Sequence, residues 1–491
     1  MAGCMFSAPK FRLIDLAKPF LAFVPEIELP YDNLPFDDKI VFTLTTALIY
    51  LFGQFPLAAI AKGSVSVKDP IFFLRGVFAA EPRTLLEFGI FPPIATALIL
   101  QLLAGFKLIK VNFSQRKDRE LFQTLIKIVS IATYAVLANI FIASGYYGED
   151  LSLVAKLLIN AQLIGAGFFV TLLIEVIDKG HGFASGAMAI VAISLSTGLV
   201  DDLFGIQQIP IDQDGNKEPR GAIINLIQGF RAKHKTLLGA IVNAFQRDYL
   251  PNLTTGLLVV VLGGVVCYLQ NVRNELSIKS TKVRGMVNVY PIRLLYTGGL
   301  SILFSYCVLF YVHILGFVVI QLIGGNKEGS IINTLMGGYE STEFFYLARF
   351  PLSLLTPPTS FFALLQQPLT LFTFTAFLII TGVWFATNWQ EISGSSSRDV
   401  AKQFKEQGVT LAHHREESKD LIKIIPVASA TGAAALAVLV AAGELLGLKG
   451  KGAGIAVAIS SAFAILEVVT VDFQQNGGQS SIAQMLGGRP A

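Results

Sequence analysis

The sequence is poor in charge and in cysteine. Of its 491 residues, 15% are charged and 53% are hydrophobic, whereas a soluble domain carries about a quarter charged residues. Two of the three cysteines, Cys267 and Cys307, lie inside long apolar runs and the third is Cys4, so we expect no disulfide framework. Alternation of apolar and polar residues at period two is also missing, which argues against an outer-membrane barrel.

Recognised catalytic motifs are missing as well. The chain contains no HExxH, no Walker A loop, no GxSxG elbow and no Cys/His cluster at metal-ligand spacing. Of the five histidines, only His313 lies inside an apolar run. We therefore predict that the protein is not an enzyme, with no catalytic residue, no bound metal and no cofactor.

Long apolar runs are abundant, and a helix needs roughly 20 apolar residues to cross a bilayer. Backbone groups in lipid must be hydrogen-bonded within the span itself, which requires helices here. The sequence therefore predicts an all-α membrane protein with about ten transmembrane helices. The runs are 41–60, 128–147, 151–174, 183–200, 253–271, 294–325, 369–388, 424–447 and 453–471, with an interrupted run at 71–106.

The interrupted run has the most unusual pattern. Residues 72–80 are apolar apart from Arg75 but are too few to span, and Pro92 and Pro93 then open an apolar helix. We expect a short, half-inserted helix followed by a turn and a shortened span. Non-helical backbone at membrane depth must be buried in protein or line a cavity, so we expect a central cavity with the short helix in it. A re-entrant hairpin without a gating role is the alternative.

Basic residues concentrate in the connections 107–119, 272–293 and 389–423. The positive-inside rule places these connections and both termini in the cytoplasm. The 206–252 connection is basic yet falls on the other side, which long loops tolerate. Asn112, in the sequon Asn-Phe-Ser, should then stay unglycosylated.

Two of these basic loops, 277–293 and 392–418, are long for connections between packed spans. An anionic lipid surface would attract them, and so would a large polyanion such as structured RNA. Length and charge alone do not decide between the two.

A secondary transporter is the alternative function, and an intramembrane enzyme comes third. Ion-coupled carriers place ionisable groups near mid-membrane. Here Lys156, Glu175, Glu444 and Glu467 lie near the ends of their apolar runs, where we expect the side chains to snorkel. A large hydrophobic conduit fits this pattern better.

Five stretches of sequence carry a family resemblance, and together they are spread over nearly the whole chain. They are FRLIDLAKPFLAFVPEIELP (11–30), ELPYDNLPFDDKI (28–40), GIFPPIATALILQLLAG (89–105), KSTKVRGMVNVYPI (279–292) and SGSSSRDVAKQFKEQGVTLAHHRE (393–416). On these the chain resembles the pore-forming α subunit of the Sec translocon, the SecY/eukaryotic protein-conducting channel family. In detail it is similar to the divergent second translocon homologue of yeasts.

The resemblance implies two inverted, pseudo-symmetric halves of five spans, 1–205 and 253–491, joined by a hinge loop at 206–252. It implies a plug near 70–82 and a lateral gate between spans two and three and spans seven and eight. The implied function is co-translational translocation of nascent chains across, and lateral insertion into, the endoplasmic reticulum membrane, with both termini cytosolic. The implied partners are the ribosome, signal sequences and nascent chains, small single-span β- and γ-type subunits, and membrane lipid.

The resemblance also implies specific site residues. The family's hydrophobic pore ring corresponds to Ile90, Ile94, Ala187, Val191, Leu303 and Val457. Its ribosome-binding residues correspond to Lys282, Arg284 and Arg415. The guanidinium groups of the two arginines suit phosphate, because they can bond it bidentately. Its often polar lateral-gate positions correspond to Ala95, Leu137 and Gly299 here, which predicts an altered signal threshold or an easier opening.

Overall fold

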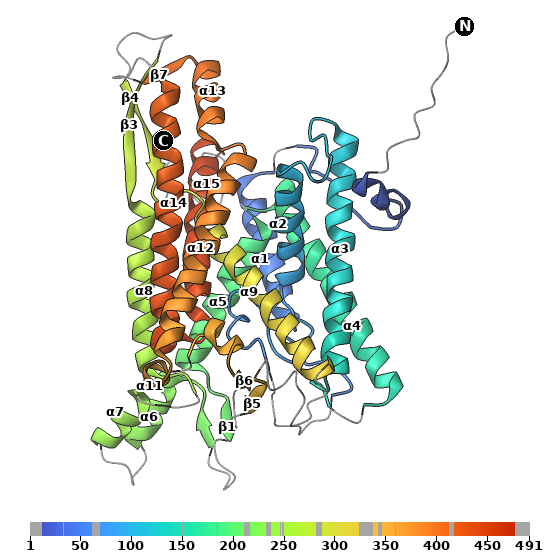
Figure 1. The fold of residues 1–491 in the computed structure, drawn as a ribbon, viewed down its shortest axis with the longest axis vertical. Helices are drawn as coiled ribbons and strands as arrows, with labels where there is room; N and C mark the ends of the chain where they lie inside the picture. The colour runs from blue at the N-terminus through green and yellow to red at the C-terminus, as the bar shows by residue number, and fades with distance from the viewer. Residues whose placement is uncertain are drawn as a thin grey trace.

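The computed structural model describes residues 12–476, except 33, 61–68, 149–150, 184, 211–216, 232–236, 246, 248–249, 281–286, 324–336, 342–345, 359 and 412–416. Within this part, eight helices are long and apolar enough to cross a membrane, and the shorter α1 and α2 bring the bundle to ten (Figure 1). The predicted ten-helix architecture is therefore confirmed. The helices are α1 (Phe36–Phe52), α2 (Phe91–Gly105), α3 (Arg116–Ala143), α4 (Leu153–Val176), α5 (Gly186–Phe204), α8 (Leu253–Asn271), α9 (Leu300–Val318), α12 (Pro368–Ile392), α14 (Glu417–Gly443) and α15 (Lys451–Asn476).

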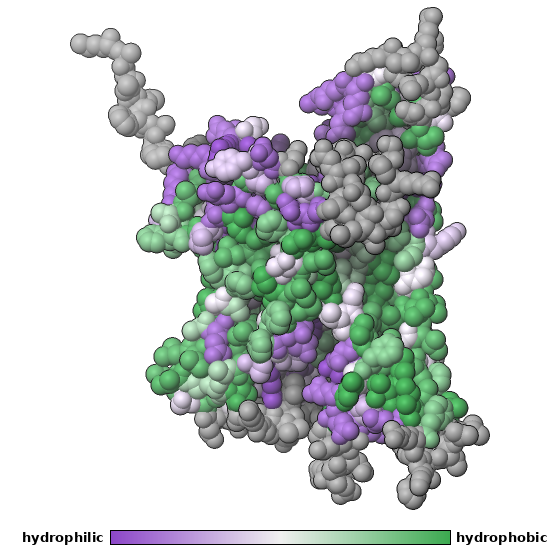
Figure 2. Space-filling model, turned by 180° about the vertical axis from the view of Figure 1, so that it is seen from behind, coloured by the Kyte–Doolittle hydropathy of each residue, from purple (hydrophilic) through white to green (hydrophobic). Residues whose placement is uncertain are grey.

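Local sequence fixes where several of these helices begin. Prolines occupy the first turn of α2, where no backbone N–H partner is needed. The Ser152 side chain caps α4 by accepting from the Ala155 N–H, and Asn252 caps α8 by accepting from the Thr255 N–H. Figure 2 shows the result on one face, a hydrophobic belt between more hydrophilic ends.

The connections contain short strands that the all-helical prediction did not include. β3 (Arg273–Ser280), β4 (Val287–Arg293) and β7 (Val409–Leu411) form an antiparallel sheet in the order β4-β3-β7. Two antiparallel pairs also form, β1 (Gln208–Pro210) with β2 (Lys217–Pro219) and β5 (Tyr339–Ser341) with β6 (Tyr346–Ala348). We call the end of the bundle that carries β3, β4 and β7 the sheet end (Figure 1).

The three-stranded sheet joins the two basic loops singled out by sequence. Ile278 of β3 pairs with Leu411 of β7, so strands from 272–293 and 389–423 share one sheet. Helix α13 (Ser397–Gln407) packs on it through Phe404, whose ring lies 5.0 Å from that of Tyr290. An apolar cluster of Ile292, Val400, Ala401, Phe404, Leu421 and Ile425 fills the space between them.

The remaining elements are short. At the sheet end, the 3₁₀ helix η1 (Leu13–Phe20) packs on α3, and Arg12 forms an ion pair with Asp118 (3.0 Å). At the opposite end, Arg247 donates to the carbonyl oxygens of Pro219 (2.7 Å) and Pro251 (3.0 Å), which closes the 206–252 connection. The others are α6 (Ala222–Arg231), α7 (Leu237–Phe245), η2 (Ile177–His181), η3 (Val319–Ile323), η4 (Leu352–Leu355), α11 (Phe361–Gln366) and η5 (Glu444–Leu448).

The interrupted run differs from its prediction in one respect. Residues 71–79 form successive turns with i to i+3 bonds, such as Leu74 N–H to the Ile71 oxygen, and contain no regular helix. They lie against the start of α15, because Gly450 approaches Phe73 so closely that a Cβ there would fall 1.9 Å from the Phe73 oxygen. The predicted short helix is therefore wrong, whereas the burial of this segment among the spans is as expected.

Candidate functional site

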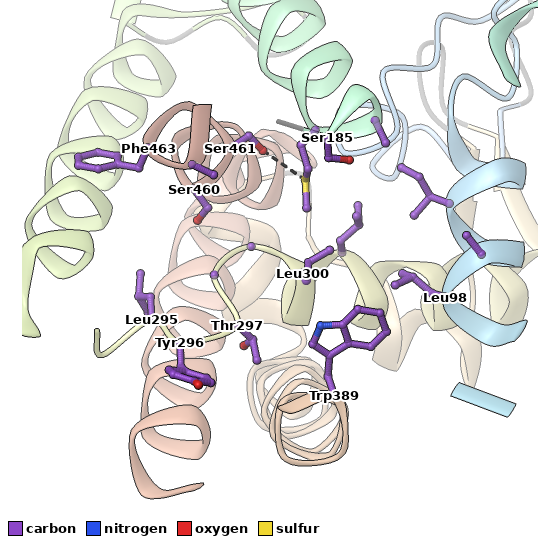
Figure 3. A pocket seen from close by; sticks show the side chains of 18 of the residues that line it. Leu98, Ser185, Leu295, Tyr296, Thr297, Leu300, Trp389, Ser460, Ser461 and Phe463 are labelled. Carbon is purple, nitrogen blue, oxygen red and sulfur yellow. Dashed lines mark hydrogen bonds between the residues drawn. The ribbon is translucent and has the colours of Figure 1, made fainter. Parts of the chain in front are cut away.

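A cavity of about 540 Å³ lies toward the sheet end. It is bounded by α2 and α5 from the N-terminal part of the chain and by α9, α12 and α15 from the C-terminal part. Figure 3 shows its wall, with Leu98 from α2, Leu300 from α9 and Trp389 from α12 around the space. On the α15 side the Ser461 hydroxyl donates to the Met188 sulfur (3.3 Å). The cavity is therefore bounded by helices of both halves of the chain.

Tyr296 closes one edge of this cavity, just beyond strand β4. Its hydroxyl donates to the Ser395 carbonyl oxygen (2.7 Å). Burial raises the pKa of the Tyr296 phenol above its ordinary value, so its hydroxyl remains a donor further into the alkaline pH range. This hydrogen bond joins the β4–α9 connection to the residues just before α13.

The six predicted pore-ring residues lie in one large apolar core or pack against it, beside the cavity. Ile94, Ala187 and Leu303 line the cavity, and Ile90, Val191 and Val457 are each 0% exposed. Five of them belong to one apolar core and Ala187 packs against it. The same core contains residues of the turn segment, namely Ile71, Phe73, Leu74, Val77 and Phe78.

The turn segment, defined here as residues 69–89, leads into Ile90 at the start of α2 and shares the same apolar core. The Ile90 N–H donates to the Phe78 oxygen (2.9 Å), and the Tyr50 and Tyr134 hydroxyls donate to the Ala79 and Gly89 oxygens (2.7 and 2.6 Å). Gly89 has φ of +50° and a Cβ there would fall 2.1 Å from the Phe78 oxygen, so only glycine fits. These bonds attach the segment to α1, α2 and α3.

A buried ionic cluster holds the turn segment in shape. Arg75 Nε lies 2.5 Å from Asp69 Oδ2 and its Nη2 lies 2.6 Å from Glu87 Oε1, with side chains 7% exposed or less. Arg75 Nη1 also donates to the Glu87 carbonyl oxygen (2.7 Å), and Nη2 to the Tyr146 hydroxyl (3.3 Å). Buried charges persist only when paired and hydrogen-bonded in this way.

On the seam side, defined as the contact of α2 with α9 and α12, the two halves meet through rings. Phe91 of α2 stacks on Phe310 of α9 with centroids 3.6 Å apart, and Tyr311 meets Phe91 edge-on at 5.2 Å. Phe106 and Trp384 lie 6.2 Å apart nearer the sheet end. Among the described residues no hydrogen bond or ion pair joins α2 to α9 or α12.

The predicted gate residues occupy three different settings. Ala95 and Leu137 are buried on α2 and α3, at 0% and 3% exposure. Gly299 precedes α9 at the sheet end and faces α15, where a Cβ would lie 3.0 Å from the Val457 Cα. Phe310 and Tyr311 of α9 make ring contacts with Phe91 of α2. Sequence reasoning missed them because aromatic residues in an apolar run look like ordinary packing.

The predicted docking residues Lys282, Arg284 and Arg415 lie outside the described residues. The strands around them are described, ending at Ser280 and resuming at Val287 on one loop, and ending at Leu411 on the other. Ser280 pairs with Val409 and Ile278 with Leu411. The described strands therefore bring both loops to one place at the sheet end.

One further expectation is corrected. Glu444 does not snorkel: it is 0% exposed, and its carboxylate accepts from the N–H groups of Gly450 (2.6 Å) and Ala453 (3.1 Å). These donors lie just before and within the first turn of α15, and an anion is favoured at the N-terminus of a helix. Glu175 likewise lies in ion pairs with Lys127 (2.8 Å) and Lys179 (2.9 Å).

Comparison with known proteins gives two family matches. The model described as SecY matches residues 84–471, and the model described as the plug domain of Sec61p matches residues 48–82. The Sec sixty-one protein homolog of Saccharomyces cerevisiae is 58% identical over 482 residues, covering 97% of this chain and 98% of that protein. The protein transport protein SEC61 subunit alpha of Neurospora crassa is 33% identical, covering 96% and 99%.

Solved structures show the same arrangement of helices. The idle yeast Ssh1 complex bound to the yeast 80S ribosome contains a chain that is 58% identical, with a TM-score of 0.78 and coverage of 96% of this chain and 98% of that one. A structure described as that of a protein conducting channel has a TM-score of 0.74 at 20% identity, covering 94% and 98%. At that identity the likeness concerns the fold alone.

Proposed function

The chain belongs to the SecY family, and we propose that it forms the pore of a protein-conducting channel in the endoplasmic reticulum membrane. Nascent polypeptides would cross through it co-translationally or leave it sideways into the lipid. The observation that supports this proposal is the cavity bounded by both halves, with an apolar core beside it that the predicted ring residues share with the turn segment. The channel itself performs no chemistry in this proposal.

The ring explains how such a channel holds back ions while it is idle. A narrow neck of aliphatic side chains makes a water column unfavourable, so ions are excluded by dewetting. Ile90, Val191 and Val457 have no exposed surface in this state. Compliant aliphatic side chains can part around a passing peptide, whereas polar groups at the same positions would hold water.

The two halves, 1–205 and 253–491, would move about the hinge loop at 206–252. The seam side supplies the lateral gate, with Ala95 and Leu137 buried beside it. Gly299 is a poor site for testing that gate by substitution, because a side chain there would meet Val457 and Ser460 of α15. Small single-span subunits would clamp the halves from the lipid side.

The sheet end would dock the ribosome. Lys282, Arg284 and Arg415 would contact ribosomal RNA, with the sheet joining both loops into one support. The described ends, η1 and the last turn of α15, lie at that same end of the bundle (Figure 1). Both termini would then be cytosolic, and Asn112 would stay free of glycan.

Ribosome co-sedimentation of the detergent-solubilised protein tests this function. Reversing the charge of Lys282, Arg284 and Arg415 together should reduce binding by an order of magnitude or more, roughly tenfold for each 1.4 kcal/mol lost. The matched control is the triple reversal of Arg116, Lys117 and Arg119, three exposed cations at the same end. Equal losses in both triple variants, or none in the first, would contradict docking through the sheet loops.

A further inference from the structure

The helices α6 and α7, in the hinge loop, each turn apolar side chains outward. In a soluble protein an amphipathic helix turns its apolar residues toward the core, so an outward set calls for an apolar partner. We call these residues the outer face. They are Ile227 and Phe230 on α6 and Ile241, Val242 and Phe245 on α7, with exposed fractions between 37% and 56%.

The bundle itself occupies another side of both helices. Ala222 of α6 and Ala244 of α7 are each 0% exposed. Arg247, just after α7, donates to the carbonyl oxygens of Pro219 (2.7 Å) and Pro251 (3.0 Å). The two helices are therefore held against the protein by one side, and the outer face is not that side.

Two contacts with the spans fix the level at which these helices lie. The Thr254 hydroxyl, in the first turn of α8, donates to the Phe245 oxygen at the end of α7 (2.5 Å). The Gly221 N–H, just before α6, donates to the oxygen of Gly205, just after α5 (2.9 Å). The spans α5 and α8 have 19 residues each, so each is about as long as the hydrocarbon core is thick, roughly 30 Å. Their ends, and with them α6 and α7, lie at the lipid–water boundary opposite the sheet end (Figure 1).

The neighbouring span favours lipid as the partner. On α8, which α7 contacts, Leu257, Val260 and Val261 form an exposed apolar stripe at i, i+3 and i+4 spacing. Lipid that covers this stripe ends at the level of α7. The outer face there continues a membrane-covered surface instead of standing alone in water.

The charge of this part of the chain also suits a membrane surface. The sequence between Glu218 and Asp248 contains no acidic residue, and the cations Arg231, Lys233 and Lys235 follow the body of α6. Cations next to an outward apolar face are typical of helices that lie in the headgroup region of a bilayer with anionic lipid. This accounts for the basic character of the 206–252 connection, which the positive-inside rule does not explain.

We propose that α6 and α7 form a membrane-surface anchor, with the outer face inserted among phospholipid headgroups of the leaflet opposite the sheet end. The partner is a bilayer surface that contains anionic phospholipid. The anchor holds the hinge loop at a constant depth while the two halves move, because an inserted face slides in the plane of the membrane but resists leaving it. This inference goes beyond the proposed channel function and does not depend on ribosome docking.

Collision accessibility of spin labels tests the anchor in nanodiscs of phosphatidylcholine and phosphatidylserine. The label is placed at Val242→Cys or Ile227→Cys in the full chain with its three native cysteines replaced. Both labels should collide severalfold more with oxygen, which concentrates in lipid, than with a water-soluble nickel chelate. The matched control is Gln228→Cys, an exposed position about 160° around α6 from Phe230, and its label should show the reverse preference.

A substitution in the outer face provides the second reading. Val242→Asp places a carboxylate in the face and should lower the oxygen preference of the Ile227 label severalfold, whereas Gln228→Asp should leave it unchanged. Both positions are exposed, so the midpoint of thermal unfolding in detergent should match the parent. Replacing all phosphatidylserine by phosphatidylcholine should also lower the preference, by a smaller factor.

Three outcomes would overturn the proposal or part of it. A preference for the nickel chelate at both Val242 and Ile227 would show that water covers the outer face. Low accessibility to both reagents would show that protein covers it, either a second copy or a small subunit, and would exclude the anchor equally. An oxygen preference that ignores the phosphatidylserine content would remove the assignment to anionic lipid. None of these readings involves the ribosome, so a failure here is distinguishable from a failure of the proposed function.

Discussion

The N-terminal and C-terminal halves meet on two sides, and the two contacts are chemically different. We call the side where α5 packs on α15 the hinge side. Lys451 forms an ion pair with Asp202 there. Leu195 packs so closely on Gly454 that a Cβ on Gly454 would lie 3.0 Å from the Leu195 side chain. On the seam side, the described contacts are aromatic and aliphatic packing around Phe91 and Phe310.

This difference shows how one bundle can open on one side. Buried ion pairs and hydrogen bonds are costly to break, because each leaves a desolvated polar group behind. Apolar contacts that separate can be replaced by contacts with another apolar surface, so their separation leaves no polar group unpaired. The seam side can therefore exchange protein for lipid or signal helix, while the hinge side keeps its bonds.

The largest expected effect comes from weakening the hinge side, and it tests whether the two sides differ. Asp202→Ala removes the carboxylate that pairs with the partly exposed Lys451 and should lower the free energy of unfolding by about 1 kcal/mol. The midpoint of thermal unfolding in detergent measures that loss. The ion conductance of the idle Asp202→Ala channel should stay at the parent level, whereas Phe310→Ala on the seam side should raise it. Equal rises in the two variants would remove the distinction between the two sides.

A smaller effect would sharpen the comparison from the seam side. Ala95→Thr places a hydroxyl at the predicted gate position on α2, where the family is often polar, and should make the seam harder to open. Translocation of signals of graded hydrophobicity should then fail severalfold more often at the weak end of the series. The control is Ala97→Thr, on the same helix but lining the cavity. An unchanged threshold in Ala95→Thr would show that seam polarity does not set it.

How far the sequence predicted this structure depended on how local each signal was. Apolar runs located the ten spans because each helix satisfies its own backbone. The helix expected at 72–80 failed because Arg75 is held by Asp69 and Glu87, and these contacts favour turns. The β3–β7 pairing could not be predicted because it joins residues more than a hundred positions apart, such as Lys279 and Thr410. The β3–β4 hairpin is local, and its strands were interpreted as part of a basic loop.

The residues of the candidate site also divide into those found from a local motif and those that only the tertiary fold brings together. Ile90 and Ile94, which the motif around 89–105 assigns to the pore ring, lie within the apolar core. The contact among the rings of Phe78, Phe91 and Phe310 could not be found from spacing, since these residues come from three segments that only the tertiary fold joins. The roles of the pore-ring and docking residues remain proposals.

The most direct test of the account compares motion on the two sides in one molecule. Spin labels at the exposed Ile99 of α2 and Ile380 of α12 report the seam side, and labels at the exposed Val200 of α5 and Leu257 of α8 report the hinge side. Distances are measured by double electron–electron resonance in nanodiscs, for the idle channel and for the channel engaged by a ribosome carrying a signal sequence. The account predicts a longer seam distance on engagement with an unchanged hinge distance. Equal lengthening of both, or a seam distance that does not change, would contradict it.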